Sequence, residues 1–206
     1  MKVKRHPTRG ENLRRALAQE AARLMAEHGI RDFRVAKRKA AERLGVVDGA
    51  ALLPKNSEIE SALGEYQRLF GGASHLVALE AQRRAALSAM RYLREFSPRL
   101  VGAVLSGTAT EHTEVQLHLF ADRLESVTLK LLDEGIPHEL TEKRFRLDAE
   151  RTQPFPGVRF AMDDQPIEAT VFPTDGIRQA PVSPVDGRPM RRANAFEVEA
   201  LLLERG

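Results

Sequence analysis

Residues 100–120 read LVGAVLSGTATEHTEVQLHLF, and two patterns in this stretch decide the fold. The first, 100–105, is a short continuous apolar run, which is typical of a strand buried on both faces. The second, 114–120, alternates between polar and apolar residues, as a strand with one buried face does. Its polar face carries Glu114, Gln116 and His118. The turn between the two patterns is formed by small residues, among them Gly107.

The chain before this stretch is predicted to be helical. Apolar residues at three- and four-residue spacing indicate helices at about 11–28, 32–44, 57–70 and 74–96. Later segments predict a helix at 122–133, a polar strand at 138–147, a hairpin formed by 158–162 and 166–172, a Pro/Gly-rich loop at 174–192 and a last helix capped by Asn194. The chain is therefore predicted to be α+β: a helical region, 1–97, packed on a small mixed sheet with flanking helices, 98–206.

Composition excludes several classes of protein. The chain has no cysteine, so disulfides, thiol catalysis and cysteine-ligated metal sites are excluded. No apolar run approaches the ~20 residues of a membrane span, and no apolar segment follows the first charged residues as in a secretory signal. By elimination we expect a cytoplasmic protein without a membrane partner.

Charge is distributed unevenly along the chain. Residues 1–44 hold 13 Lys and Arg against 5 Asp and Glu, a balance of +8, whereas the remaining residues hold 19 against 24, a balance of −5. A basic segment indicates a polyanionic partner, and Arg34, Lys37 and Arg38 could follow a nucleic-acid backbone. A DNA-binding regulator is one alternative function, and a merely solvated helical face is the other interpretation of these charges.

The polar residues after the apolar run suggest phosphate and metal chemistry. A turn formed by Ser106, Gly107 and Thr108 offers backbone N–H groups and hydroxyls to a phosphate. Glu114 and Gln116 share a strand face, and Glu168 lies on the polar face of a later strand, so these side chains could hold a divalent cation together. Arg188, in the C-terminal loop, could clamp a phosphate. The alternative is that the acidic residues belong only to the wet faces of amphipathic strands.

The layout over 98–172 resembles the nucleotidyltransferase fold of the DNA polymerase beta superfamily. In that family a strand ending in Gly-Ser or Gly-Gly precedes a strand with an acidic-apolar-acidic motif, and a third acidic residue comes from a later strand. The whole chain, including 183–190, is also similar to an uncharacterised group of bacterial proteins labelled nucleotidyltransferases. The resemblance implies that Gly107 and Thr108 form the phosphate-binding turn. It makes Glu114 the first metal ligand and Glu168 the third carboxylate, acting as base or extra ligand.

The chain departs from the family pattern at three points. Gln116 replaces the second carboxylate, Glu114 stands where Asp is commoner, and the loop from Gly107 to Glu114 is short. An amide oxygen brings no charge, which favours one Mg²⁺ or Mn²⁺ over two. The resemblance implies transfer of a nucleoside monophosphate from a nucleoside triphosphate to an acceptor such as RNA or protein. The alternative it leaves is a catalytically degenerate relative that binds nucleotide or nucleic acid.

Overall fold

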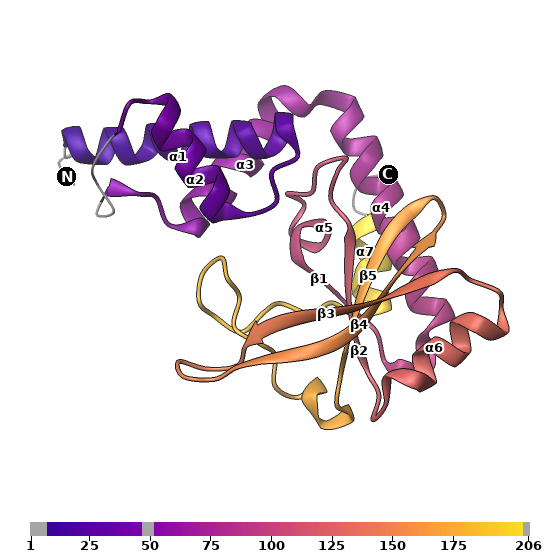
Figure 1. The fold of residues 1–206 in the computed structure, drawn as a ribbon. Helices are drawn as coiled ribbons and strands as arrows, with labels where there is room; N and C mark the ends of the chain where they lie inside the picture. Colours follow the sequence, from indigo (N-terminus) through magenta and orange to yellow (C-terminus); the bar gives the residue numbers. More distant parts are fainter. Residues whose placement is uncertain (1–7, 47–51, 204–206) are drawn as a thin grey trace, which may run out of the picture. The chain divides into compact units, whose positions relative to one another are not determined.

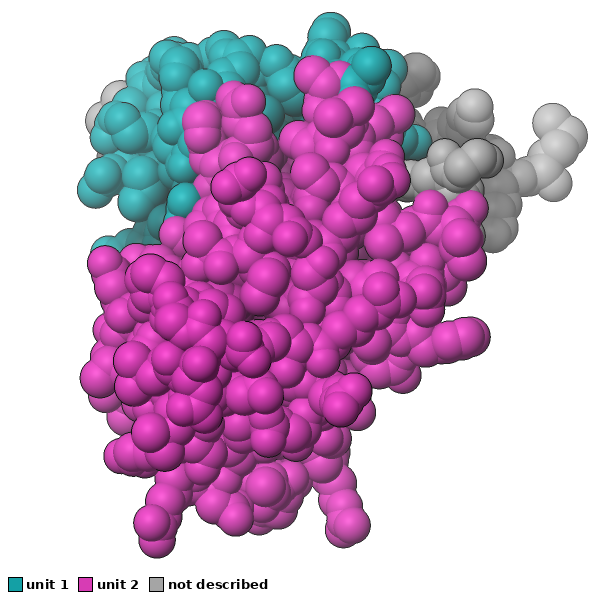
Figure 2. All heavy atoms as spheres, turned by 90° about the vertical axis from the view of Figure 1, so that its right-hand side faces the viewer, with its two compact units in different colours: residues 1–73 teal, residues 74–206 magenta. Residues whose placement is uncertain are grey.

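The computed structural model describes residues 8–46 and 52–203. The chain forms two compact units, 1–73 and 74–206 (Figures 1 and 2). The sequence placed this boundary at residue 97, and the difference is explained by helix α4 (Gly72–Tyr92). Its buried side chains, such as Leu79 and Met90, belong to the hydrophobic core of the sheet, so the helix folds with the second unit.

Within residues 8–46 and 52–73, the first unit is built from helices α1 (Arg9–His28), α2 (Phe33–Arg43) and α3 (Asn56–Tyr66), the last followed by a π-helical turn, η2 (Gln67–Gly71). Thr8 and Glu11 form a capping box at the start of α1, and Asp32 caps α2 by accepting a hydrogen bond from the Val35 N–H at 2.9 Å. The apolar faces of these helices close over one small core.

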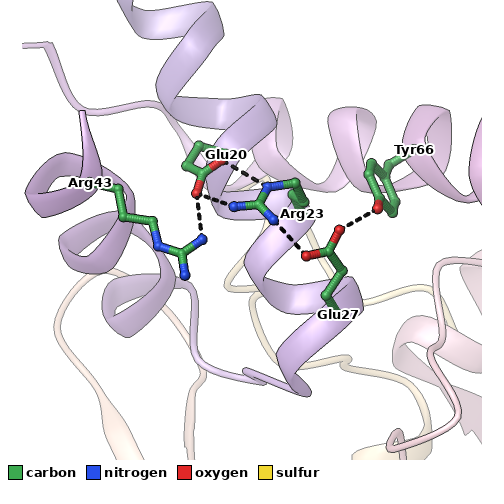
Figure 3. A network of polar contacts seen from close by, with 5 residues as sticks. All are labelled: Glu20, Arg23, Glu27, Arg43 and Tyr66. Atoms are coloured by element: carbon green, nitrogen blue, oxygen red, sulfur yellow. Dashed lines mark hydrogen bonds and ion pairs between the residues drawn. The ribbon is translucent and has the colours of Figure 1, made fainter.

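A network of polar contacts links the three helices of the first unit (Figure 3). Arg23 on α1 donates to Glu20 at 2.8 Å and to Glu27 at 2.6 Å. Arg43 on α2 donates to Glu20 at 3.1 Å, and the Tyr66 hydroxyl on α3 donates to Glu27 at 2.7 Å. The hydrogen bond from Tyr66 is the main reason that the pKa of Glu27 lies below its ordinary value. These contacts fix the register of the helices around their core.

The second unit contains a five-stranded mixed sheet in the order β1-β2-β5-β4-β3. Its strands are β1 (Arg99–Val101), β2 (Val115–Phe120), β3 (His138–Arg146), β4 (Thr152–Met162) and β5 (Gln165–Phe172). Strands β2 and β5 are parallel, and the other neighbours are antiparallel. The unit is therefore α+β, as the sequence predicts.

One face of the sheet is covered by helices α4, α6 (Leu124–Asp133) and α7 (Ala195–Leu203) (Figure 1). The alternating apolar residues of β2, among them Leu117 and Leu119, are buried against these helices. Asn194 caps α7, because its side chain accepts a hydrogen bond from the Glu197 N–H at 3.0 Å. In the described part of the chain, no helix combines the length and the apolar character that crossing a membrane would require.

The opposite face of the sheet, called the open face below, carries a second small core at one end. Phe120, Phe145, Phe155 and Phe172 pack there. The segment 174–193, called the C-terminal strap below, adds Ile177 and Met190 to these rings. The other end of the open face has no such cover of aromatic side chains, and it carries the polar residues of β2 and β5.

The predicted strand at 100–105 is wrong in its second half. Strand β1 ends at Val101, and a short helix, α5 (Gly102–Ser106), follows. Gly102 has φ +72°, which turns the chain out of the extended conformation. Val104 and Leu105 are buried in the same core from the helix. A continuous apolar run cannot distinguish a short buried helix from a buried strand.

Candidate functional site

The candidate site is a row of polar side chains across the open face of the sheet. Gln116 on β2 pairs with Glu168 on β5, and Glu168 pairs with Arg159 on β4. Glu114 precedes β2 by one residue and lies two residues before Gln116, on the same face. Glu114 is thus one strand across from Glu168 and two residues along, which puts their α-carbons about 8 Å apart. The register puts the three residues on one face, and the convergence of their side chains on one cation stays a prediction.

Both carboxylates of the site lie against basic side chains. Lys143 on β3 contacts Glu168, with Nζ 2.5 Å from Oε2, and Arg159 contacts Glu114, with Nη2 3.5 Å from Oε2. The acidic side chains are only 14% and 16% exposed, whereas the lysine and the arginine are 35% and 43% exposed. The two negative charges on this sheet face are therefore balanced by two positive charges, and the side chains that carry the positive charges are the more exposed ones.

The glycine that follows the buried strand is Gly102 and not Gly107. Gly102 has φ +72°, which favours glycine, and an added Cβ there would lie 2.7 Å from the Oε1 of the Gln116 side chain, so the backbone at Gly102 lies directly against the Gln116 amide. Gly107 instead ends helix α5 with φ +82°, beside the Arg83 guanidinium. The loop from Gly107 to Glu114 is short compared with the family pattern. If the connection is counted from Gly102 instead, it is five residues longer.

The predicted phosphate turn lies at the other end of α5 from Gln116. The Ser106 and Thr108 hydroxyls are hydrogen-bonded to each other at 2.9 Å on an exposed surface. Both flank Gly107, whose N–H donates to the Ala103 carbonyl at 2.9 Å. The backbone N–H of Gly107 is therefore used by the helix end, and phosphate binding by Ser106, Gly107 and Thr108 stays a prediction.

The residues present fit one divalent cation better than two. Two carboxylates and one amide share the face, and the phosphates of a nucleotide would complete the ligand set of Mg²⁺ or Mn²⁺. Among residues 8–46 and 52–203, no group of three or more acidic, histidine or cysteine side chains is placed to hold a metal ion. A single cation would have to compete with Lys143 and Arg159 for the carboxylates.

His118 does not belong to the polar site, although it continues the polar face of β2. Its side chain is 1% exposed and packs against Phe172 and Phe145, with ring centroids 4.6 and 5.3 Å away. The Arg192 Nε in the C-terminal strap donates to the His118 Nδ1 at 3.1 Å. Burial first, then the charges of Arg192 and Lys143, hold the pKa of His118 well below its ordinary value. The strand alternation placed His118 on the polar face, whereas the structure buries its side chain among aromatic rings.

Arg192 fastens the C-terminal strap to the sheet. Its guanidinium lies 4.9 Å from the Phe120 ring centroid and 5.2 Å from that of Phe172, and its Nη1 donates to the Gly176 carbonyl at 2.8 Å. Burial, with a smaller effect of Arg99, lowers the pKa of Arg192 to about 10. Its role is therefore to close one end of the open face, next to the polar row.

Arg188 is not gathered with the carboxylates. It lies in an exposed turn of the strap whose Gly187 is close to the Arg146 side chain, at the end of β3. The strap also meets β3 there, because the Val182 N–H donates to the Arg146 carbonyl at 2.7 Å. Binding of a phosphate by Arg188 stays a prediction.

The predicted nucleic-acid residues lie on α2 in the first unit. Arg34 and Arg38 are exposed and Lys37 is half-buried, and they line a shallow groove with Val35 and Asn56. Arg38 is 3.8 Å from Glu42, so part of its charge is compensated within the helix. A salt-dependent contact with nucleic acid, and the regulator alternative that depends on it, stay predictions.

Two residues of the site were not predicted from the sequence, namely Lys143 and Arg159. The alternation around Val158 and Phe160 in β4 would have placed Arg159 on the polar face, but β3 shows no such alternation for Lys143. Neither strand gives the order of the strands in the sheet. Comparisons of the chain with protein-family models, with curated proteins and with solved structures found no match.

Proposed function

We propose that the second unit binds a nucleoside triphosphate and one divalent cation at the polar row, and that it is a nucleotidyltransferase. The observation that carries this proposal is the register of β2 and β5, which puts Glu114, Gln116 and Glu168 on one face beside Gly102. Acidic residues from two neighbouring strands beside a glycine are part of what the resemblance implies, and Gln116 is where the chain departs from it.

Each residue has a distinct task in this proposal. Glu114 and Glu168 would hold the cation, and Gln116 would offer a neutral oxygen. A bound cation neutralises the triphosphate and helps to align the attacking oxygen of the acceptor. Gly102 has no Cβ, so a phosphate would approach the backbone there once the Gln116 amide, which lies against it, moves aside. Glu168 would also accept the proton of the attacking hydroxyl, which RNA or protein would supply as the acceptor.

Binding and transfer are tested separately. Titration calorimetry with each of the four ribonucleoside triphosphates and Mn²⁺ measures binding, and incubation with α-³²P-labelled triphosphates and bulk RNA or protein measures transfer. We expect the Glu114→Gln and Glu168→Gln variants to lose both the binding of the triphosphate and the transfer of the label. Glu142→Gln is the matched control, because Glu142 lies exposed on the opposite face of β3. Equal binding by the wild type and the Glu114→Gln/Glu168→Gln pair would refute the metal site.

A second function, nucleotide binding without transfer, is favoured by Gln116. Its amide stands where a second charged ligand would be needed for two cations, and both carboxylates are already balanced by basic residues. Metal-dependent binding of a triphosphate without any labelled acceptor would support this second function. Restoring the carboxylate with Gln116→Asp or Gln116→Glu should then increase the affinity for Mn²⁺.

A further inference from the structure

We infer that Lys143 and Arg159 are exchangeable counter-ions of the polar row. They pair with Glu168 and Glu114 in the structure, and they would bind the phosphates once a cation takes the carboxylates. This inference rests on the proposed function, and it assigns triphosphate binding to two residues that no sequence motif indicates.

The first observation is the pairing itself. Each carboxylate of the row has its own basic partner, Lys143 for Glu168 and Arg159 for Glu114, and the partners come from two other strands. Without them, two negative charges would share a largely covered surface. The protein therefore supplies beside these carboxylates the positive charge that a cation would otherwise bring.

The second observation is the difference in exposure within each pair. The carboxylates are 14% and 16% exposed, but Lys143 and Arg159 are 35% and 43% exposed. Rotation about the side-chain bonds can therefore move either cationic group outward while the carboxylates stay in place. The released ammonium and guanidinium would lie at the edge of the row, where the phosphates of a nucleotide would need positive charge.

The exchange predicts opposite effects on two ligands. In Lys143→Met, Mn²⁺ no longer competes with an ammonium group for Glu168. The affinity of the site for Mn²⁺ alone should therefore rise about fivefold. The affinity for Mn²⁺-tripolyphosphate should fall roughly tenfold, because the lost charge-assisted hydrogen bond outweighs that gain. Arg159→Met should show the same pair of changes. Tripolyphosphate is used because its binding does not depend on the base of the nucleotide.

Electron paramagnetic resonance of free Mn²⁺ measures the first affinity, and titration calorimetry measures the second. Lys130→Met is the matched control, because Lys130 is 34% exposed, pairs with Glu95 at 3.6 Å and lies on α6. It should change neither affinity. Lys143→Arg keeps the charge and should keep both affinities near the wild-type values, which separates loss of charge from loss of folding.

The outcomes distinguish this inference from the proposed function. If the wild type binds neither tripolyphosphate nor any nucleoside triphosphate with Mn²⁺, the proposed function is wrong and the inference fails with it. If the wild type binds but Lys143→Met shifts both affinities in the same direction, or shifts neither, the exchange is refuted and the nucleotide site stands.

Discussion

Lowering the pH from about 7.5 to about 5.5 should destabilise the second unit by about 1.4 kcal/mol through His118 alone. The buried imidazole accepts a hydrogen bond from Arg192, so its pKa in the folded state lies well below the ordinary value. The unfolded chain binds a proton at that site near pH 6.5, and the folded chain does not. Stability from this residue is therefore present above pH ~6.5 and is lost as the pH falls, at about 1.4 kcal/mol per unit.

Native-state hydrogen exchange of the β2 and β5 amides measures this effect in the second unit alone, after correction for intrinsic exchange rates. His118→Gln removes the titrating group. Over the same pH range, the free energy of unfolding of this variant should therefore fall by about 1.4 kcal/mol less than that of the wild type. His112→Gln is the control, because the His112 side chain is 52% exposed. The reasoning is refuted if the wild type and His118→Gln lose equal stability between the two pH values.

Three further perturbations have defined outcomes. Gly157→Ala should destabilise the second unit by about 1–3 kcal/mol in urea unfolding, because the new Cβ would lie 2.6 Å from the Ala169 carbonyl oxygen; an unchanged midpoint would contradict this. Arg192→Met should release the C-terminal strap, so limited proteolysis should cut the strap faster than in the wild type. Tyr66→Phe should raise the pKa of Glu27 towards its ordinary value, measured by NMR titration of the carboxyl carbon, since the main hydrogen bond that lowers it is lost.

Local patterns predicted β2, β3 and β5 close to their observed bounds, whereas residues 152–157 of β4 were not predicted and β1 ends at Val101. The alternation at 114–120 gives β2 and its buried face, and Asp163 and Asp164 form the two-residue turn between β4 and β5, with φ 49° and 60°. These features depend on neighbours in the sequence, where the period of two and the turn residues carry the information.

Features that depend on distant segments could not be predicted in the same way. His118 has the spacing of an exposed strand residue, but Arg192, far along the chain, covers it. The glycine beside the acidic strand could not be chosen between Gly102 and Gly107 until α5 was seen. Lys143 and Arg159 join the site only because β3 and β4 follow β5 in the sheet order.

Paramagnetic broadening of backbone amide signals by Mn²⁺ in the presence of a nucleoside triphosphate locates the cation without any assumption about activity. If Glu114 and Glu168 hold it, the amides of β2 and β5 around Gln116, and that of Gly102, should broaden first. In the Glu114→Gln/Glu168→Gln pair this broadening should disappear. Broadening that is centred on α2, or that is the same in the wild type and the paired variant, would contradict a cation site on the open face.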